Sequence, residues 1–147
     1  MEPELITGGV AVDDRGSLSF VNSFDFRTYG IRRMYTVQFN VAEQVRAWHG
    51  HKIEHKYMMC IDGAALVCAA RVLDWLEPVV EEMPSRYVLA MEKVAVLCIP
   101  AGYIHGIMSL RPMTRLLVFS TASLEEGKND DFRFPPRFID PWFVIER

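Results

Sequence analysis

Cysteine is scarce in this 147-residue sequence, and neither sign of charge dominates it: there are three cysteines and the formal net charge is −3. Cys60, Cys68 and Cys98 show no Cys-x-x-Cys spacing, which argues against a thiolate metal site. Each lies in an apolar stretch, so we predict buried free thiols in a reducing compartment. The nearly balanced charge makes nucleic acid and anionic membrane surfaces poor partners.

Long apolar runs and internal repeats are also absent. No stretch reaches the ~20 consecutive apolar residues that a membrane-spanning helix requires, and residues 1–6 lack the basic start and apolar segment of a signal peptide. We therefore predict a cytoplasmic protein without membrane association. Its length fits a single domain, residues 1–147, that is long enough to bury a hydrophobic core.

Short apolar or alternating stretches make up most of the chain, with turn signals such as Asp13–Gly16 about every 8–12 residues. Such spacing predicts an all-β sandwich or barrel without a long helix. The segment 73–84, with two prolines and four acids, fits a solvent-facing loop or a short helix. The expected strands are residues 5–12, 17–21, 31–39, 45–51, 57–61, 64–72, 86–91, 94–99, 105–110 and 115–121.

The C-terminal part begins polar and acidic at Ser123 and ends in an aromatic, proline-rich tail, residues 132–147. The acids in 125–131, like those in 77–82, are most simply interpreted as solvent-facing. We expect the tail to pack across the mouth of the barrel or against a neighbouring subunit.

Three of the four histidines, His49, His51 and His55, lie within seven residues, and Lys52 and Lys56 lie beside them. Alternate side chains of a strand share a face, so His49 and His51 should point into the same enclosure. Lys56 has the opposite parity, but a turn between Lys52 and His55 would reset the count. Two imidazoles and an ammonium directed into one cavity predict a proton-transfer or anion site.

Two motifs resemble those of the cupins. His49-x-His51 followed by Lys56 resembles the first cupin motif, with lysine in place of its metal-binding glutamate, and residues 100–105 (P-A-G-Y-I-H) resemble the second, whose histidine is His105. The resemblance implies a double-stranded β-helix, the cupin jelly roll, with the site in its mouth. The missing glutamate implies neither metal nor cofactor.

Within the cupins, the sequence is most similar to the nucleotide-sugar epimerases and isomerases. Asp14–Gly16 resembles their D-x-R-G element, and Arg46–His49 (R-A-W-H) resembles the R-G-L-H of the dTDP-4-dehydrorhamnose 3,5-epimerases, whose active-site lysine matches Lys56. Residues 99–106 resemble the I-P-x-G-x-x-H-G of that family.

The dTDP-sugar 3,4-ketoisomerases are matched at least as well in the front half, by Asp14–Leu18, Arg33–Tyr35 and Arg46–Lys52. The sequence also departs from the epimerases. Their tyrosine general acid belongs near Val118, where no tyrosine stands, and Asp140 is the nearest match to the aspartate that orients the base. These departures concern double 3,5-epimerisation, whereas proton abstraction from a ketosugar is unaffected.

The resemblance implies a catalytic role for four residues. His49 would be the base, Lys56 the group that stabilises the enolate, and His51 a group that orients the sugar or a second acid or base, with Tyr35 as the best-placed hydroxyl. This chemistry is sound, because a C–H beside a ketone becomes removable when a base is positioned over it and the developing enolate is stabilised.

The resemblance also implies substrate-binding residues. Arg15 and Arg46 suit a diphosphate, because a guanidinium can bind two oxygens at once, although a surface salt bridge is a serious rival for Arg15. For His105, a structural and a substrate-binding role are equally compatible with the sequence. An aromatic residue such as Trp48 or Phe20 would stack on the base of the nucleotide.

We therefore predict a metal-independent epimerase of a nucleotide-linked 4-keto-6-deoxyhexose in deoxysugar and lipopolysaccharide biosynthesis, with a 3,4-ketoisomerase as the alternative. A metal-dependent cupin, in which His49, His51 and His105 hold the ion, and a non-catalytic sugar-binding module are the competing hypotheses. The resemblance further implies a homodimer, for which the apolar N-terminal strand and the aromatic tail are suitable interface material.

Overall fold

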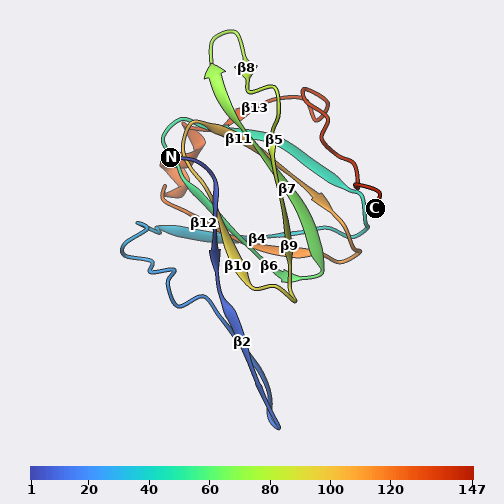
Figure 1. Cartoon of the computed structure of the whole chain (residues 1–147). Helices are drawn as coiled ribbons and strands as arrows, with labels where there is room; N and C mark the ends of the chain where they lie inside the picture. Colours follow the sequence, from blue (N-terminus) through green and yellow to red (C-terminus); the bar gives the residue numbers. More distant parts are fainter.

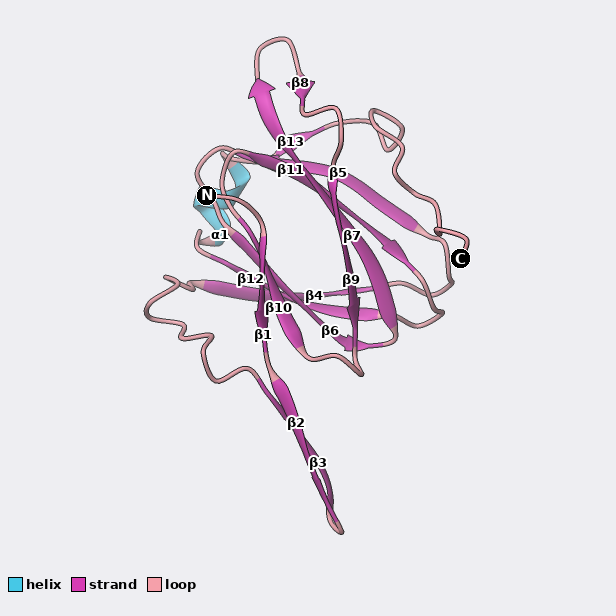
Figure 2. Cartoon of the chain, viewed as in Figure 1, coloured by secondary structure: helices cyan, strands magenta, loops and turns pink.

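The computed structural model describes residues 1–147, and antiparallel strands dominate it (Figures 1 and 2). Nearly all its ordered elements are strands because β-branched and aromatic residues alternate with small and polar ones between closely spaced turns. The elements are β1 Glu4–Thr7, β2 Gly9–Asp13, β3 Gly16–Phe20, β4 Arg33–Gln38, β5 Val45–His51, β6 Lys56–Asp62, β7 Ala64–Asp74, β8 Val79–Val80, β9 Ser85–Ala90, β10 Ala95–Ile99, β11 Tyr103–Ser109, β12 Arg115–Ser120, α1 Leu124–Lys128 and β13 Phe132–Arg133.

Two sheets face each other across the core. One has five strands in the order β1-β10-β6-β12-β4, and the other has the order β13-β5-β11-β7-β8, with β9 also paired to β7. Every pairing is antiparallel. This arrangement confirms the predicted all-β cupin jelly roll, and it sends β5 and β6, consecutive in the chain, into opposite sheets.

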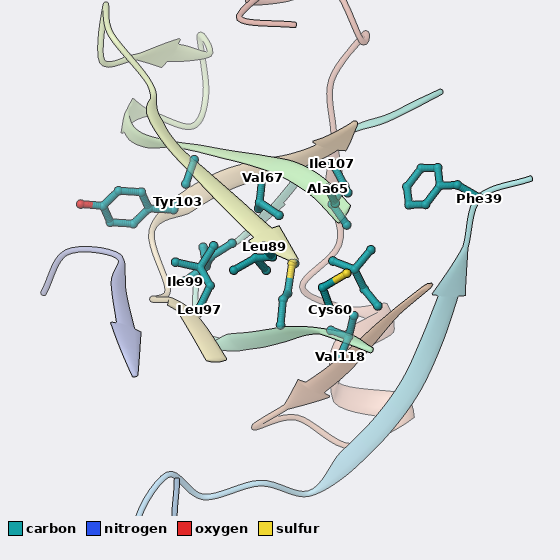
Figure 3. Packing of buried hydrophobic residues seen from close by; sticks show 13 residues of the cluster. Phe39, Cys60, Ala65, Val67, Leu89, Leu97, Ile99, Tyr103, Ile107 and Val118 are labelled. Carbon is teal, nitrogen blue, oxygen red and sulfur yellow. The ribbon is translucent and has the colours of Figure 1, made fainter. Parts of the chain in front are cut away.

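The core follows from strand alternation, which β7 shows most clearly. Val67 and its alternate neighbours point between the sheets, whereas Leu66 and Cys68 point to the outer side. Figure 3 shows the inner cluster, which includes Val67 of β7 and Leu97 and Ile99 of β10 in the facing sheet. This cluster fills the space between the sheets and leaves one end of it to polar side chains.

Both outer faces of the sheets are covered by other segments. Phe24 and Tyr29 of the β3–β4 connection pack on the five-stranded sheet. The aromatic tail packs on the six-stranded sheet, where the ring of Trp142 lies 4.9 Å from that of Trp48, centroid to centroid. Most of the tail therefore covers an outer face, not the mouth of the barrel.

Three expectations about local structure need correction. The strand expected at 5–12 is split at Gly8 into β1 and β2, because β1 pairs with β10 whereas β2 pairs with β3. The segment 73–84 contributes the short strand β8. The helix α1 was not expected, although Ser123 and Glu126 form a capping box at its start.

The β2–β3 hairpin projects away from both sheets (Figures 1 and 2). Its apolar side chains have no cover: Val12 is 76% exposed and Leu18 is 66% exposed. Arg15 lies at its tip and pairs with Asp13. The hairpin therefore exposes apolar surface that a monomer leaves in water.

The three cysteines are buried and free, as predicted. No helix of the chain has the length and apolar character needed to cross a membrane.

Candidate active site

A cavity of about 370 Å³ opens between the two sheets, at the polar end of the core. Its floor is apolar and is formed by four side chains that also belong to or pack on the core: Val37, Met58, Ile107 and Val118. The walls are formed by charged and titratable residues from both sheets. A small volume with an apolar floor and convergent polar groups is the usual form of a ligand site.

Three imidazoles line the wall that belongs to the six-stranded sheet. His49 and His51 come from β5, and His105 comes from β11, where it is the register partner of His49. The ring centroid of His105 lies 6.0 Å from that of His49 and 5.6 Å from that of His51. The alternation rule thus correctly predicted the shared face, and the second cupin motif correctly predicted the third imidazole.

A β-bulge brings Arg46 to the same wall. Between His49 and Arg46 the strand β5 advances three residues, while its partner β11 advances two, from His105 to Ile107. The extra residue reverses the alternation, so that Arg46 and His49 both line the cavity although strict alternation would separate them.

Trp48 is adjacent to the inward-facing His49 and therefore points to the opposite, outer face of the strand. Its side chain is fully buried beneath the aromatic tail, and its indole N–H donates to the carbonyls of Pro136 and Ile139. Trp48 does not reach the cavity, and its predicted contact with a nucleotide base is therefore not supported. Arg15, at the tip of the hairpin, does not line the cavity of its own chain either.

Lys56 and Tyr35 line the opposite wall, which belongs to the five-stranded sheet. The Lys56 ammonium lies 5.3 Å from the centre of the Tyr35 ring. The turn that sequence parity required between β5 and β6 is present, so that Lys56 faces the same cavity as His49. Tyr35 is the register partner of Val118 on β12, which places a phenol beside the position where the epimerase tyrosine is missing.

The loop between β5 and β6 is held by Asp130, which no sequence motif distinguishes from the neighbouring acids. Both carboxylate oxygens of Asp130 accept backbone N–H groups, those of Lys52, Ile53 and Glu54, at 2.8–2.9 Å. The backbone carbonyl of Asp130 also lies 2.6 Å from Nδ1 of His51. The interpretation of this acid as solvent-facing was wrong, since Asp130 is buried.

A second unforeseen carboxylate, Glu54, lines the cavity and is also buried. It accepts hydrogen bonds from Lys56 and Ser120, and it lies 3.4 Å from a nitrogen of Arg33. Burial alone would raise the pKa of Glu54, but the hydrogen bonds from Lys56 and Ser120 outweigh it and hold this pKa below its usual value.

Asp131, not Asp140, stands near the first histidine. Its carboxylate lies 3.9 Å from Nδ1 of His49. Asp140 forms a salt bridge with Arg137 at 2.7 Å and does not line the cavity. Neither the contact of Asp131 with His49 nor the salt bridge of Asp140 with Arg137 was predictable, because the sequence does not show which acidic side chain turns toward the cavity.

All three cavity histidines have a pKa below the usual value. For His49 the main cause is burial, followed by the nearby charge of Arg133. For His51 it is burial and then Lys56. The pKa of the fully enclosed His105 falls furthest, through burial and its two imidazole neighbours. Neutral imidazoles, which can accept a proton, therefore line the wall at neutral pH.

The cavity carries an excess of positive charge. Five of its lining side chains are cations and two are carboxylates. Arg46 and Arg133 come from β5 and β13, and Lys128 comes from α1, so the cations surround the imidazoles. Such a lining attracts an anionic ligand and disfavours a cationic one. The cations are Arg33, Arg46, Lys56, Lys128 and Arg133.

The metal-cupin hypothesis finds little support in this geometry. The only three potential ligand atoms within 4.8 Å of one another belong to His51, Glu54 and Asp130. The Asp130 oxygens already accept three N–H groups, and Glu54 is paired with Lys56, whose charge would repel a cation. The three imidazoles do not form such a group, so the residues do not fit a metal.

Comparison with known proteins places the fold. The family described as WxcM-like, C-terminal (FdtA) matches residues 2–132, and no curated protein matches significantly. The dTDP-4-dehydrorhamnose 3,5-epimerase of Bacillus anthracis str. Ames, with TDP and PPi bound, is 18% identical and aligns over 98% of this chain and 86% of its own, with a TM-score of 0.74.

Two ketoisomerase structures are similarly close. A 3,4-ketoisomerase from Helicobacter canadensis is 18% identical over 91% of this chain and 92% of its own, with a TM-score of 0.71. A mutant of the 3,4-ketoisomerase QdtA from Thermoanaerobacterium thermosaccharolyticum, in complex with TDP-4-keto-6-deoxyglucose, is 18% identical over 90% and 88%, with a TM-score of 0.68. At such identities the likeness establishes the shared jelly roll.

Proposed function

Because this chain belongs to the WxcM-like, C-terminal family, we propose that it is an isomerase that transfers a proton at a carbon beside the C4 ketone of a nucleotide-linked 4-keto-6-deoxyhexose. The observation that carries this proposal is the pair of facing walls: imidazoles on one sheet, and Lys56 with Tyr35 on the other, across a cavity of about 370 Å³. The solved relatives that bind TDP or TDP-4-keto-6-deoxyglucose suggest a dTDP sugar as the substrate.

The reaction begins at His49. Its neutral imidazole takes the proton from the carbon next to the ketone, and the C–H electron pair moves into an enolate whose charge forms on the carbonyl oxygen. Lys56 on the facing wall stabilises that oxygen through its positive charge. Tyr35 then returns a proton to the same carbon from the other side of the ring, which inverts the centre. The net reaction is epimerisation, and solvent restores both residues.

The cations at the rim bind the diphosphate. Arg46 and Arg133 flank the imidazole wall and provide guanidinium groups, which bind pairs of phosphate oxygens. Lys128 adds a third charge from α1. The sugar then lies between the walls, and the nucleoside extends outward.

A 3,4-ketoisomerase is the second candidate, and His51 favours it. His51 lies beside His49 on the same wall, so that a proton taken from C3 can be returned to C4 on the same face of the ring. The hydroxyl proton of O3 passes to O4 in the same reaction, and the carbonyl thereby moves from C4 to C3.

Proton NMR of dTDP-4-keto-6-deoxyglucose in deuterated water with the purified protein tests the proposal. Deuterium at C3 alone, or at C3 and C5, with inverted configuration supports an epimerase. A carbonyl at C3 identifies the ketoisomerase. Neither exchange nor a product, with binding retained, would leave only the sugar-binding module.

A further inference from the structure

No sequence motif points to Glu54, yet its side chain is only 1% exposed. The residue lies in the loop between β5 and β6, and its two oxygens have different surroundings. Oε1 accepts from Lys56 and Ser120. Oε2 has no hydrogen-bond partner and lies 3.4 Å from Nδ1 of His51. The carboxylate therefore stands between two groups that the proposed reaction uses.

The charges around Glu54 explain why a carboxylate is tolerated there. A buried carboxylate without partners is very costly, but Lys56 and Arg33 both approach Oε1. Two cations thus share one anion, and one positive charge remains uncompensated at the wall of the cavity. The hydrogen bonds keep Glu54 ionised at neutral pH.

The second oxygen bears on His51. Its Nδ1 lies 2.6 Å from the carbonyl of Asp130, and a carbonyl only accepts, so Nδ1 carries the proton of the neutral ring. Nε2 is then the nitrogen left to accept a proton from a ligand in the cavity. When it does so, the ring becomes a cation with the charge of Glu54 on its other side.

We infer that Glu54 is a positioning residue that links His51 to Lys56. Its carboxylate holds the Lys56 ammonium at the cavity wall, and it stabilises the imidazolium that forms when His51 takes a proton. His51 thereby becomes a proton-transfer group in its own right beside His49. The inference rests on the proposed function for its substrate, but its electrostatic part concerns the ligand-free protein.

The first test follows the pKa of His51 without substrate, by NMR of the protein labelled with ¹⁵N-histidine. Glu54→Gln keeps the side-chain size and an acceptor for Ser120 but removes the charge, so we expect this pKa to fall. Glu125→Gln on α1, an exposed acid outside the site, is the matched control and should leave it unchanged.

The remaining groups around His51 are the same in both variants and cannot produce the difference. They are Lys56 from β6, His105 from β11, His49 from β5 and Asp130 after α1.

Lys56→Met supplies a shift of the opposite sign. It removes the repulsive ammonium and leaves Glu54 free to attract the ring, so the pKa of His51 should rise. This variant keeps the inference testable should Glu54→Gln not fold. Unchanged pKa values of His51 in the folded variants would overturn it.

The second test is turnover of the ketosugar. We expect Glu54→Gln to lower kcat about a hundredfold, because misplacing a reacting group costs that much, with KM little changed. Glu54→Gln/Lys56→Gln should be no worse than the poorer single variant, since the two residues act as one unit. Additive losses would overturn the coupling, whereas a wild-type protein without turnover refutes the proposed function and leaves the NMR result to decide the inference.

Discussion

Residues that exchange protons with the two faces of one sugar ring must stand on opposite sides of it. His49 and Tyr35 meet this condition because they belong to different sheets. The first can remove a proton and the second can deliver one. Because the two residues have different roles, replacing each of them should impair a different step.

Replacing the base should stop all chemistry, whereas replacing the phenol should stop only inversion. We expect His49→Gln to lower both deuterium exchange and product formation by about 10²–10⁴-fold, the usual contribution of a general base. Tyr35→Phe should retain exchange of the C–H with deuterium and lose the inverted product. Both quantities can be followed by NMR in deuterated water.

Equal losses of exchange and product in Tyr35→Phe would contradict delivery of the proton by this phenol. Inversion at an undiminished rate would contradict it as well.

The pH dependence of the reaction should report the neighbours of His49. Burial and Arg133 lower its pKa, whereas Asp131 opposes them. The base is active when neutral, so kcat/KM falls as pH drops through this pKa, which lies below that of an ordinary histidine. Asp131→Asn removes an attraction and should move the acid limb to lower pH. Arg133→Gln should move it to higher pH.

Opposite shifts from two neighbouring residues provide an internal control, since a general loss of structure would not change sign. Shifts of the same sign would mean that another group governs the limb.

Strand alternation made the shared inward face of His49 and His51 predictable, because a period of two needs no tertiary information. It could not predict that Arg46 faces the cavity, because the bulge that turns this residue inward depends on pairing with β11. It also missed Glu54 and Asp130, because a carboxylate is buried only where the fold supplies partners. The second cupin motif correctly indicated His105, because the turn before this residue sets where the strand β11 begins.

At the scale of the element, the position of a loop can depend on one anchoring residue. The β5–β6 loop has no regular structure, and Asp130 accepts three of its N–H groups. This anchor comes from the turn after α1, whose capping box sets where the helix begins. A distant element thus determines the position of His51.

Removing this anchor should destabilise the protein more than removing its neighbour. We expect Asp130→Ala to lower the free energy of unfolding by about 3 kcal/mol, because three backbone N–H groups, one of them buried, lose a charged acceptor. Asp131→Ala, which breaks only partly exposed ion pairs, should cost about 0.5 kcal/mol or less. Urea denaturation followed by circular dichroism measures both, and equal losses would show that the loop does not depend on Asp130.

At the scale of the whole molecule, the β2–β3 hairpin is the part whose stability neither of the two sheets explains, because it projects away from both. A two-stranded hairpin is marginally stable in water by itself, and this one also exposes Val12 and Leu18. We propose that a second copy of the chain covers it in a homodimer. Arg15 would then be presented to the partner, and any contact it makes with substrate would depend on that assembly.

Charges on the hairpin should therefore separate the subunits. We expect Val12→Asp/Leu18→Asp to convert a dimer into a monomer in size-exclusion chromatography with light scattering. Leu76→Asp changes an even more exposed leucine in the β7–β8 turn, 92% exposed, and should leave the dimer intact. A monomeric wild type, or a dimer that tolerates both hairpin charges, would refute this arrangement.

Because of the extra residue in β5, the direction of the Arg46 guanidinium can change independently of the direction of the imidazoles. His49 pairs with His105 on one side of the irregularity, and Arg46 pairs with Ile107 on the other. Shortening the strand by one residue there would turn the guanidinium to the outer layer while the imidazoles kept their register. In this way the side chains that bind the anionic part of the ligand could change during evolution, while the acid–base residues kept their positions.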